Sequence, residues 1–149
     1  MTSVVDLEIR APRETVAALF ADPANDLKWM DDLARIEPLV GRLGEVGSTY
    51  RFVQKEGGRS FIATVIARDL PREVRLDLDD ADMHIAITDR FETLPNGRTR
   101  LISKEVFESK GMLRRMLMFL GRSGMRKAHR RHMEAFRRFA ERSAERSRD

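Results

Sequence analysis

The sequence predicts an α+β fold in which a curved, seven-stranded antiparallel sheet wraps around one long C-terminal helix. Residues 111–146 repeat apolar side chains at helical spacing and contain no proline. Residues 34–108 instead alternate with a period of two between turn sequences, as antiparallel strands do. A single strand and two short helices precede them, so the sheet has one helix long enough to cover it.

Length and composition fit a single domain that comprises residues 1–149. A chain of this length buries about two-thirds of its unfolded surface, which is enough for one hydrophobic core. The absence of cysteine excludes disulfides, thiolate nucleophiles and thiolate metal sites. The N-terminal residues show no basic region followed by an apolar run, and we therefore expect a cytoplasmic protein.

The N-terminal region predicts a strand followed by two short helices. In residues 4–11, Val5, Leu7 and Ile9 alternate with charged side chains, which indicates a half-buried strand. A helix is predicted at 13–21, where Asp22-Pro23 ends it, and another at 24–32. Trp29, between these helices and the first hairpin, is expected at the mouth of a cavity.

The six remaining strands are separated by turns that contain glycine, proline, aspartate or asparagine. Alternation places Tyr50 and Phe52 on one inward face, and Leu101, Glu105 and Phe107 on another. For the third and the fifth of these strands the pattern leaves the register open. The six strands are predicted near residues 34–40, 48–55, 60–69, 73–79, 83–93 and 98–108.

The long C-terminal helix, which Ser109 is expected to cap, has an apolar arc whose middle is lined with small residues. Glycine inside a helix costs about 1 kcal/mol relative to alanine, so Gly121 and Gly124 need a reason. Three readings stay open: close packing on a strand, a simple kink, or the wall of a ligand cavity. A straight helix would be about 54 Å long, and we expect a bend near Gly121. At about 100° per residue, these residues share an arc of roughly 140°: Leu113, Leu117, Gly121, Gly124, Met125, Ala128, His132, Ala135, Phe136 and Phe139.

Positive charge is concentrated in this helix. Residues 1–109 contain 15 Lys and Arg against 20 Asp and Glu, whereas residues 110–149 contain 13 against 4. Such a face can meet nucleic acid, an anionic membrane or an acidic partner. The alternative is a solvated face that partly neutralises an acidic body.

Several kinds of site are not indicated. Gly41, Gly44 and Gly47 recur every third residue, but the Lys-Ser/Thr ending of a phosphate loop is missing. His129 and His132 lie one helical turn apart, yet the sequence indicates no third metal ligand. Nothing places a serine, a histidine and an acid together as a hydrolytic triad. We therefore expect no metal and no cofactor.

Four residues are candidates for the cavity. His132 lies in the apolar arc, either as a ligand contact or acid/base group or as a hydrogen-bonded core residue. Glu105, if its strand face is inward, is a carboxyl group with a raised pKa; with the opposite register it faces solvent. Trp29 and Tyr50 combine a large apolar area with one polar group. His84 is expected to be exposed.

Six short segments occur in a characteristic order along the chain. They are Ala11-Pro12-Arg13-Glu14-Thr15-Val16, Leu19-Phe20-Ala21-Asp22, Trp29-Met30, Ile36-Glu37-Pro38-Leu39, Val46-Gly47-Ser48-Thr49-Tyr50 and Asn96-Gly97-Arg98-Thr99-Arg100-Leu101. With these segments the chain resembles the START-like, or SRPBCC, superfamily with the helix-grip fold, and within it the polyketide cyclase/dehydrase-like proteins. The resemblance implies a cavity between sheet and helix that holds an apolar molecule of polyketide, lipid or isoprenoid type. Some members of that set act as cofactor-independent cyclases and others only bind.

Two functional hypotheses follow. The first is a binding protein for a small hydrophobic molecule, with or without cyclase/dehydratase activity in which Glu105, His132 or Tyr50 moves protons. The second is an interaction module whose basic helix docks on RNA, a ribosome or an anionic membrane. The oligomeric state, monomer or homodimer, stays open. The residues expected to contact the ligand are Trp29, Tyr50, Phe52, Phe107, Leu117, Gly121, Gly124 and Ala128.

Overall fold

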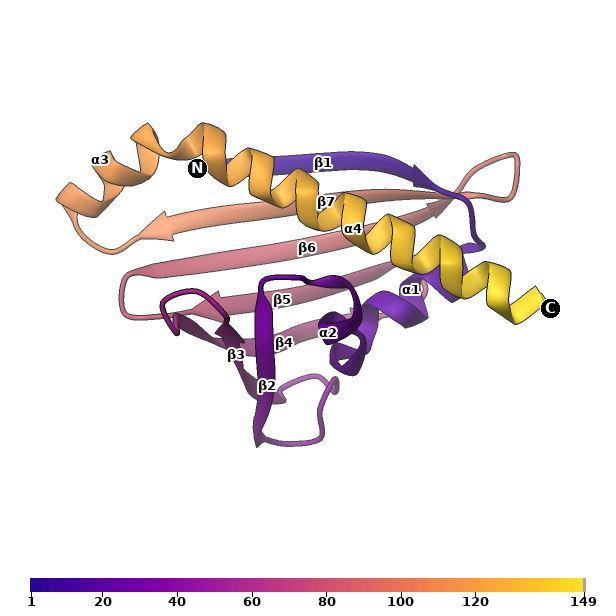
Figure 1. Cartoon of the computed structure of the whole chain (residues 1–149), viewed down its shortest axis with the longest axis horizontal. Helices are drawn as coiled ribbons and strands as arrows, with labels where there is room; N and C mark the ends of the chain where they lie inside the picture. The colour runs from indigo at the N-terminus through magenta and orange to yellow at the C-terminus, as the bar shows by residue number, and fades with distance from the viewer. Residues whose placement is uncertain (149) are drawn as a thin grey trace.

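A computed structural model describes residues 1–148 as one antiparallel sheet with helices on one face (Figure 1). The predicted α+β fold, with its seven strands, two short helical segments and long C-terminal helix, is confirmed. The strands are β1 (Thr2–Ile9), β2 (Leu33–Val40), β3 (Thr49–Gln54), β4 (Ser60–Asp69), β5 (Glu73–Asp79), β6 (Met83–Thr93) and β7 (Thr99–Ser109). The helices are α1 (Arg13–Ala21), the 3-10 helix η1 (Pro23–Asn25), α2 (Asp26–Trp29), α3 (Met112–Leu120) and α4 (Arg122–Arg148).

The strands follow one another from β2 to β7, and β1 closes the order by pairing with β7. Every pair of neighbouring strands is antiparallel, and the strands from β2 to β7 form a meander without a crossover. The register that the pattern left open for 60–69 has Phe61, Ala63 and Val65 buried. In β6, Ile85 and Asp89 are buried on the same face.

Helix α4 crosses the sheet and forms the main core with β1 and α1 (Figure 1). Apolar side chains of β1, such as Val5 and Ile9, belong to the same buried cluster as Phe136 and Phe139 of α4. Val16 of α1 joins that cluster and is fully buried. Each buried side chain of this size contributes about 1.5–3 kcal/mol to the stability of the fold.

The second short helix is shorter than predicted. Its expected range, 24–32, contains η1 and then only four residues of α-helix, which end at Trp29. Asp22 begins η1 by accepting a hydrogen bond from the backbone N–H of Ala24. Met30 has extended backbone angles, so the chain leaves the helix and enters β2 at Leu33.

The long C-terminal helix is divided at Gly121, where the sequence predicted a bend. Helix α3 ends at Leu120, and α4 starts at Arg122. The expected cap is wrong, because Ser109 is the last residue of β7 and Gly111 precedes α3 instead. Gly111 has a φ of +102°, which a residue with a Cβ atom rarely adopts.

The predicted apolar arc is right only in its C-terminal part. Phe136 and Phe139 are buried, but Leu117, Gly121 and Gly124 are exposed, and Leu117 retains 57% of its accessible surface. A Cβ atom added to Gly124 would meet nothing within 4 Å. Close packing and cavity wall are therefore wrong for these glycines, whereas the kink agrees with the break between α3 and α4 at Gly121. The buried residues of α4 are His129, Met133, Phe136, Phe139, Ala140 and Ala144.

Within residues 1–148, no helix is both long enough and apolar enough to cross a membrane.

Candidate functional site

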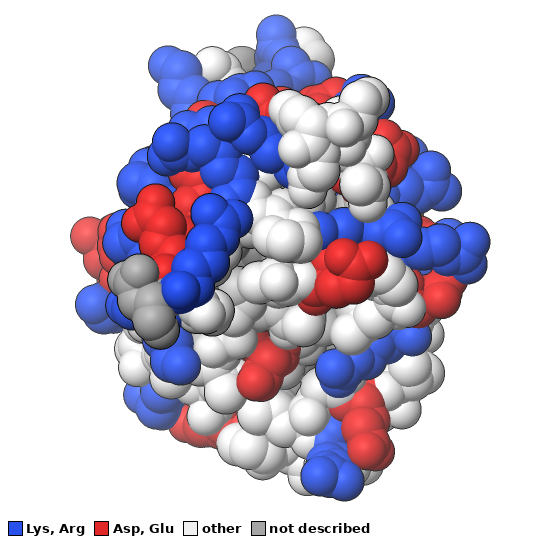
Figure 2. Space-filling view, turned by 90° about the vertical axis from the view of Figure 1, so that its right-hand side faces the viewer, with Lys and Arg blue, Asp and Glu red and all other residues white. Residues whose placement is uncertain are grey.

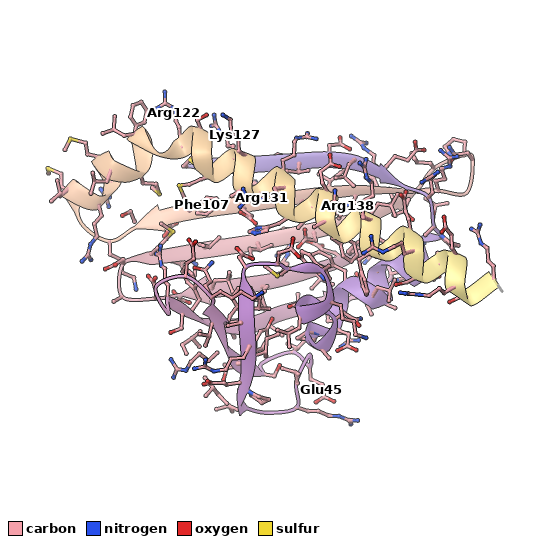
Figure 3. All side chains as sticks on the ribbon, in the orientation of Figure 1. Glu45, Phe107, Arg122, Lys127, Arg131 and Arg138 are labelled. Carbon is pink, nitrogen blue, oxygen red and sulfur yellow. The ribbon has the colours of Figure 1, made fainter. Side chains whose placement is uncertain are left out.

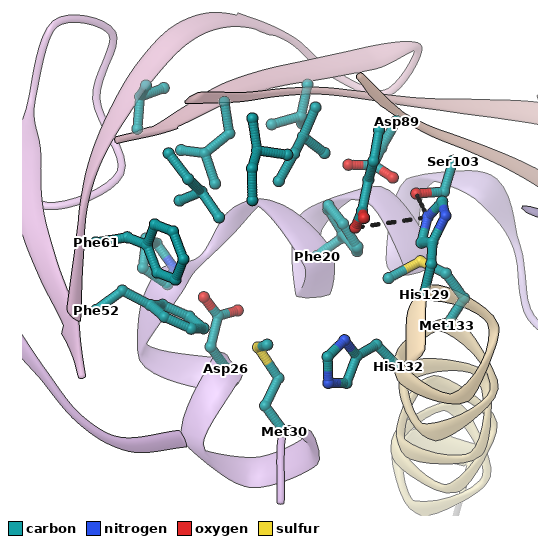
Figure 4. Close-up of a pocket in the computed structure, with 18 of the residues that line it drawn as sticks. Phe20, Asp26, Met30, Phe52, Phe61, Asp89, Ser103, His129, His132 and Met133 are labelled. Atoms are coloured by element: carbon teal, nitrogen blue, oxygen red, sulfur yellow. Dashed lines mark hydrogen bonds and ion pairs between the residues drawn. The ribbon is translucent and has the colours of Figure 1, made fainter. Parts of the chain in front are cut away.

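A cavity of about 450 Å³ lies between the sheet and the helices α2 and α4 (Figure 4). Its size falls within the range of about 300–1,000 Å³ that is common for small-molecule pockets. Strands β3 to β7 supply apolar side chains such as Phe52 and Phe61, and these face His129 and Met133 of α4 across the cavity. The walls are thus mainly apolar, with a small number of polar groups among them.

Seven of the ten residues predicted for the site line this cavity, and three do not. The three are Leu117, Gly121 and Gly124, which lie on the exposed surface around the break between α3 and α4. Their prediction as cavity wall is wrong because the arc that faces the body is rotated in α4. Whether the other seven contact a ligand stays a prediction: Trp29, Tyr50, Phe52, Glu105, Phe107, Ala128 and His132.

Trp29 belongs to the core and does not stand at the mouth. Its side chain is only 7% exposed. The indole ring stacks on Phe20, with ring centroids 6.2 Å apart, and meets Phe136 edge-on at 5.3 Å. The expected rim position is therefore wrong, although one side of the residue still lines the cavity.

Four polar residues form a cluster on the α4 side of the cavity, which we call the acid–imidazole cluster: Asp89, Ser103, Glu105 and His129. Register brings the first three together, because Asp89 of β6 lies opposite Ser103 of β7, and Glu105 follows two residues later. The His129 Nε2 atom lies 2.9 Å from Ser103 Oγ and 3.6 Å from Glu105 Oε1 (Figure 4). On its other side, His129 Nδ1 lies 2.8 Å from the hydroxyl of Ser3.

Burial changes the protonation of this cluster, because an apolar environment disfavours charge. It raises the pKa of Asp89 to about 7, against a hydrogen bond from Ser103 that lowers it. Burial, with the nearby charge of Asp89, raises the pKa of Glu105 to about 8. Burial also lowers the pKa of His129 to about 4, and the neighbouring His132 and Arg130 act in the same direction. Near neutral pH, Glu105 is therefore mainly a neutral hydrogen-bond donor, and His129 is uncharged.

Two polar atoms around the cavity are buried without a hydrogen-bond partner among the described residues. They are Oδ1 of Asp89 and Nε1 of Trp29, one acceptor and one donor. Leaving such an atom unsatisfied costs about 1–3 kcal/mol. Because nearly all buried polar groups in proteins are paired, Asp89 Oδ1, whose carboxyl group points toward the cavity in Figure 4, marks a position where a ligand can gain a hydrogen bond.

Further polar residues, Asp26, Tyr50 and His132, line the cavity away from the acid–imidazole cluster. Burial raises the pKa of Asp26 well above its ordinary value, and the charges of Asp22 and Asp89 add to the effect. The pKa of Tyr50 is also raised, mainly by burial and then by Asp26, so its hydroxyl stays protonated. His132 Nε2 lies 3.1 Å from Asp32 Oδ2 and is half-buried at the edge of the cavity.

Glu105 faces inward, as the strand pattern predicted, and its burial raises its pKa. His84 is not fully exposed as expected, because it is half-buried with Nδ1 2.7 Å from Asp79 Oδ1. In residues 1–148, no three side chains of His, Asp or Glu are grouped so that they could hold a metal ion.

Sequence reasoning missed Asp26 and Asp89 and considered His129 only as a metal ligand. A signal existed for Asp89, since it has the same parity in β6 as the buried Ile85 and Phe91. An acid at an inward position of a strand indicates a functional or hydrogen-bonded group. His129 lies about 20° outside the predicted arc, so a slightly wider arc would have included it.

Comparison with known proteins shows the fold. Neither a family model nor a curated protein matches the chain. Solved structures match over nearly its whole length. TTHA0849 from Thermus thermophilus is 15% identical with a TM-score of 0.78, and the match covers 97% of this chain and 99% of that one. The protein Ara h 8.0201 is 12% identical with a TM-score of 0.72, covering 94% and 97%.

The chain has the Bet v 1-like helix-grip fold. A third helix-grip structure, the hypothetical protein jhp0584 from Helicobacter pylori, is 14% identical with a TM-score of 0.74, covering 94% of this chain and 88% of that one. At such identities the likeness supports the architecture and no particular activity. The narrower resemblance to polyketide cyclase/dehydrase-like proteins stays a prediction.

Proposed function

We propose that this helix-grip protein binds one small, mainly apolar molecule that has an uncharged polar group, in the cavity between the sheet and α4. The observation that supports this most directly is the unpartnered Oδ1 atom of Asp89 in a cavity whose walls are otherwise mainly apolar. Apolar walls favour transfer of the ligand from water, and the few polar atoms set its orientation.

The acid–imidazole cluster favours a carbonyl or hydroxyl group over a carboxylate. A carbonyl oxygen can accept a hydrogen bond from protonated Glu105, and a hydroxyl group can donate one to Asp89. A carboxylate would lose its hydration and lie beside Asp89, which is partly ionised at neutral pH. Among the expected ligand types, polyketides and isoprenoid quinones or alcohols fit this cavity better than free fatty acids.

Native mass spectrometry of freshly purified protein should show a co-purified compound. Calorimetric titration with two ring-matched probes, 2-naphthol and 2-naphthoate, then tests the polarity of the site. We expect the neutral naphthol to bind more tightly at pH 7. Equal or tighter binding of the naphthoate would contradict the assignment of the polar group.

Two substitutions one turn apart in α4 test the position of the ligand. Ala128→Leu adds volume at a cavity-lining position, whereas Gly124→Leu adds the same side chain to the exposed surface. Ala128→Leu should weaken naphthol binding and Gly124→Leu should leave it unchanged. If neither changes the affinity, the probe binds elsewhere.

The same cluster favours a second proposal, proton transfer on a bound polyketone chain. Asp89, with a pKa of about 7, suits a general base, and Glu105, with a pKa of about 8, suits a general acid. Asp89 would remove a proton from the carbon between two carbonyls, and the resulting enolate would attack a third carbonyl. That oxygen would take the proton of Glu105. The ionised Glu105 would then remove the second proton from the same carbon while protonated Asp89 gives its proton to the new hydroxyl, which leaves as water and restores both carboxyl groups. No metal or nucleotide is required for these steps.

A short poly-β-ketone thioester is a suitable substrate, and mass spectrometry would detect a product lighter by one water. Glu105→Gln should abolish turnover while naphthol binding is retained, since the amide keeps the shape and a donor. A reaction no faster than the uncatalysed one would contradict catalysis and leave the binding proposal standing.

A further inference from the structure

Helix α3 exposes an unusual amount of apolar surface. None of its nine residues is buried, although most of them are large and apolar. The exposed fractions range from 55% for Met116 to 87% for Met112. Single exposed apolar residues are normal, but a contiguous group marks an interaction site. The six exposed apolar residues are Met112, Leu113, Met116, Leu117, Phe119 and Leu120.

The orientation of α3 directs this group away from the protein. At about 100° per residue, the six side chains occupy an arc of roughly 160°. Met118 lies opposite the centre of the arc and packs against the cluster of Phe61, Ile85 and Phe107. Arg114, also outside the arc, forms an ion pair with Asp82 at 2.8 Å. Met118 and Arg114 thus attach α3 to the rest of the protein, and the apolar arc faces solvent.

The sequence around this arc contains many basic residues and no acidic ones. Residues 110–133 contain eight Lys and Arg and no Asp or Glu. The guanidinium of Arg122 lies 3.9 Å from the ring centroid of Phe119, and Arg126 and Lys127 are exposed on the following turns. Figure 3 shows Arg122 and Lys127 on the outer side of the helix near the end where α3 lies.

The other end of the molecule has a different charge pattern. Figure 2 views that end, where α4 finishes, and basic and acidic side chains are interspersed there around uncharged ones. Arg10 pairs with Glu141 at 3.2 Å, and Arg137 pairs with Glu134. Of these two ends, as far as residues 1–148 show them, the α3 end is the one that combines an outward apolar arc with a block of one charge sign.

We propose that α3 docks on the surface of an anionic lipid bilayer, with its apolar arc between headgroups and acyl chains. Arg122, Arg126 and Lys127 would contact the lipid phosphates, since a basic amphipathic helix binds such surfaces in this way. Nucleic acid would match the cations but would leave the Leu and Met side chains in water. A second copy of the chain would bring two cationic borders together. This inference does not depend on what occupies the cavity.

Co-sedimentation of the full chain with vesicles tests the proposal. Vesicles of phosphatidylcholine alone are compared with vesicles that contain about a quarter phosphatidylserine. We expect binding to the anionic vesicles only, and weaker binding as salt is raised, because screening shortens the reach of the charges.

Matched variants separate the two parts of the surface. Arg126→Gln with Lys127→Gln should lower the partition coefficient about 30-fold, since each cation near an anionic surface contributes several-fold. Arg138→Gln with Arg142→Gln, two exposed cations in the C-terminal half of α4, should have much less effect. Leu113→Ser with Leu120→Ser should lower binding about tenfold or more, whereas Val40→Ser, an exposed apolar residue of β2, should not.

Four results would overturn the proposal. One is equal binding to both kinds of vesicle, and another is an equal loss of binding in the two charge variants. The third is a stable dimer in sedimentation that Leu113→Ser with Leu120→Ser converts to monomer while vesicles bind neither form. A control melt shows whether the variants fold, and Leu113→Gln alone provides a milder test of the arc. Salt-sensitive binding to a homopolymeric RNA that the apolar variant retains, with no vesicle binding, would also count against it.

Discussion

Helices α3 and α4 are consecutive, basic and amphipathic, yet their apolar sides face opposite environments. Helix α4 buries six side chains and packs against β1, α1 and α2, whereas α3 buries none. Gly121 separates them, and it allows the chain to change direction where the sheet can no longer be covered. Helical periodicity therefore identifies an apolar arc but does not identify what the arc contacts.

A pair of phenylalanine truncations should show the largest effect. Phe136 of α4 is fully buried against Phe20 and Trp29, so Phe136→Ala should destabilise the fold by about 3–5 kcal/mol. Phe119 of α3 is 61% exposed, and Phe119→Ala should change stability by less than about 0.5 kcal/mol. Urea unfolding followed by circular dichroism measures both. Similar losses in the two variants would mean that α3 belongs to the folded core.

The next largest effect is the pH dependence of stability, which the buried carboxyl group of Glu105 should cause. Because the folded pKa of Glu105 is raised, the folded state holds its proton at pH values where the unfolded chain has released it. Stability should therefore decrease as pH rises, by the slope that proton linkage sets. Between pH 6.5 and 8 the titration of Glu105 should lower the free energy of unfolding by roughly 2 kcal/mol. The lowered pKa of His129 acts in the opposite direction, but mainly between about pH 4 and 6.5, as stability is lost on acidification.

Unfolding experiments on the wild type and on Glu105→Gln across pH 6.5–8 isolate this contribution. The variant should show a flatter profile, with a residual slope from Asp89, whose pKa is about 7. A site-resolved NMR titration of Glu105 provides an independent measurement. A pKa near the ordinary 4.5 would place the carboxyl group in water and remove it from the acid–imidazole cluster.

The fold and part of the site could be predicted because strand alternation is local. Tyr50, Phe52, Glu105 and Phe107 follow from parity within single strands, and all four line the cavity. The acid–imidazole cluster could not be predicted in the same way. It depends on the register that sets Asp89 opposite Ser103, and on the rotation of α4 that brings His129 to Ser3 and Ser103. Both are tertiary relations between segments far apart in the sequence.

The glycines near the break between α3 and α4 also show what the sequence pattern cannot predict. A glycine in a helical arc indicates a kink or a close neighbour, but the space beside Gly124 is open. Because the position faces solvent, any small side chain fits there. The presence of glycine at this position therefore gives no information about its surroundings.

The smallest predicted effect tests this last point. Gly124→Ala should stabilise the protein by up to about 1 kcal/mol, because alanine favours the helix and its Cβ atom meets nothing within 4 Å. Gly111→Ala is the matched control: a Cβ atom there also has free space, but the φ of +102° is unfavourable for alanine. That variant should lose stability by about 1 kcal/mol or more, since Ala at a positive φ is strained. Thermal melts of both variants give the comparison. If Gly124→Ala lowers the melting temperature, the start of α4 is not a regular helix in solution, and the break that separates the two helices extends beyond Gly121.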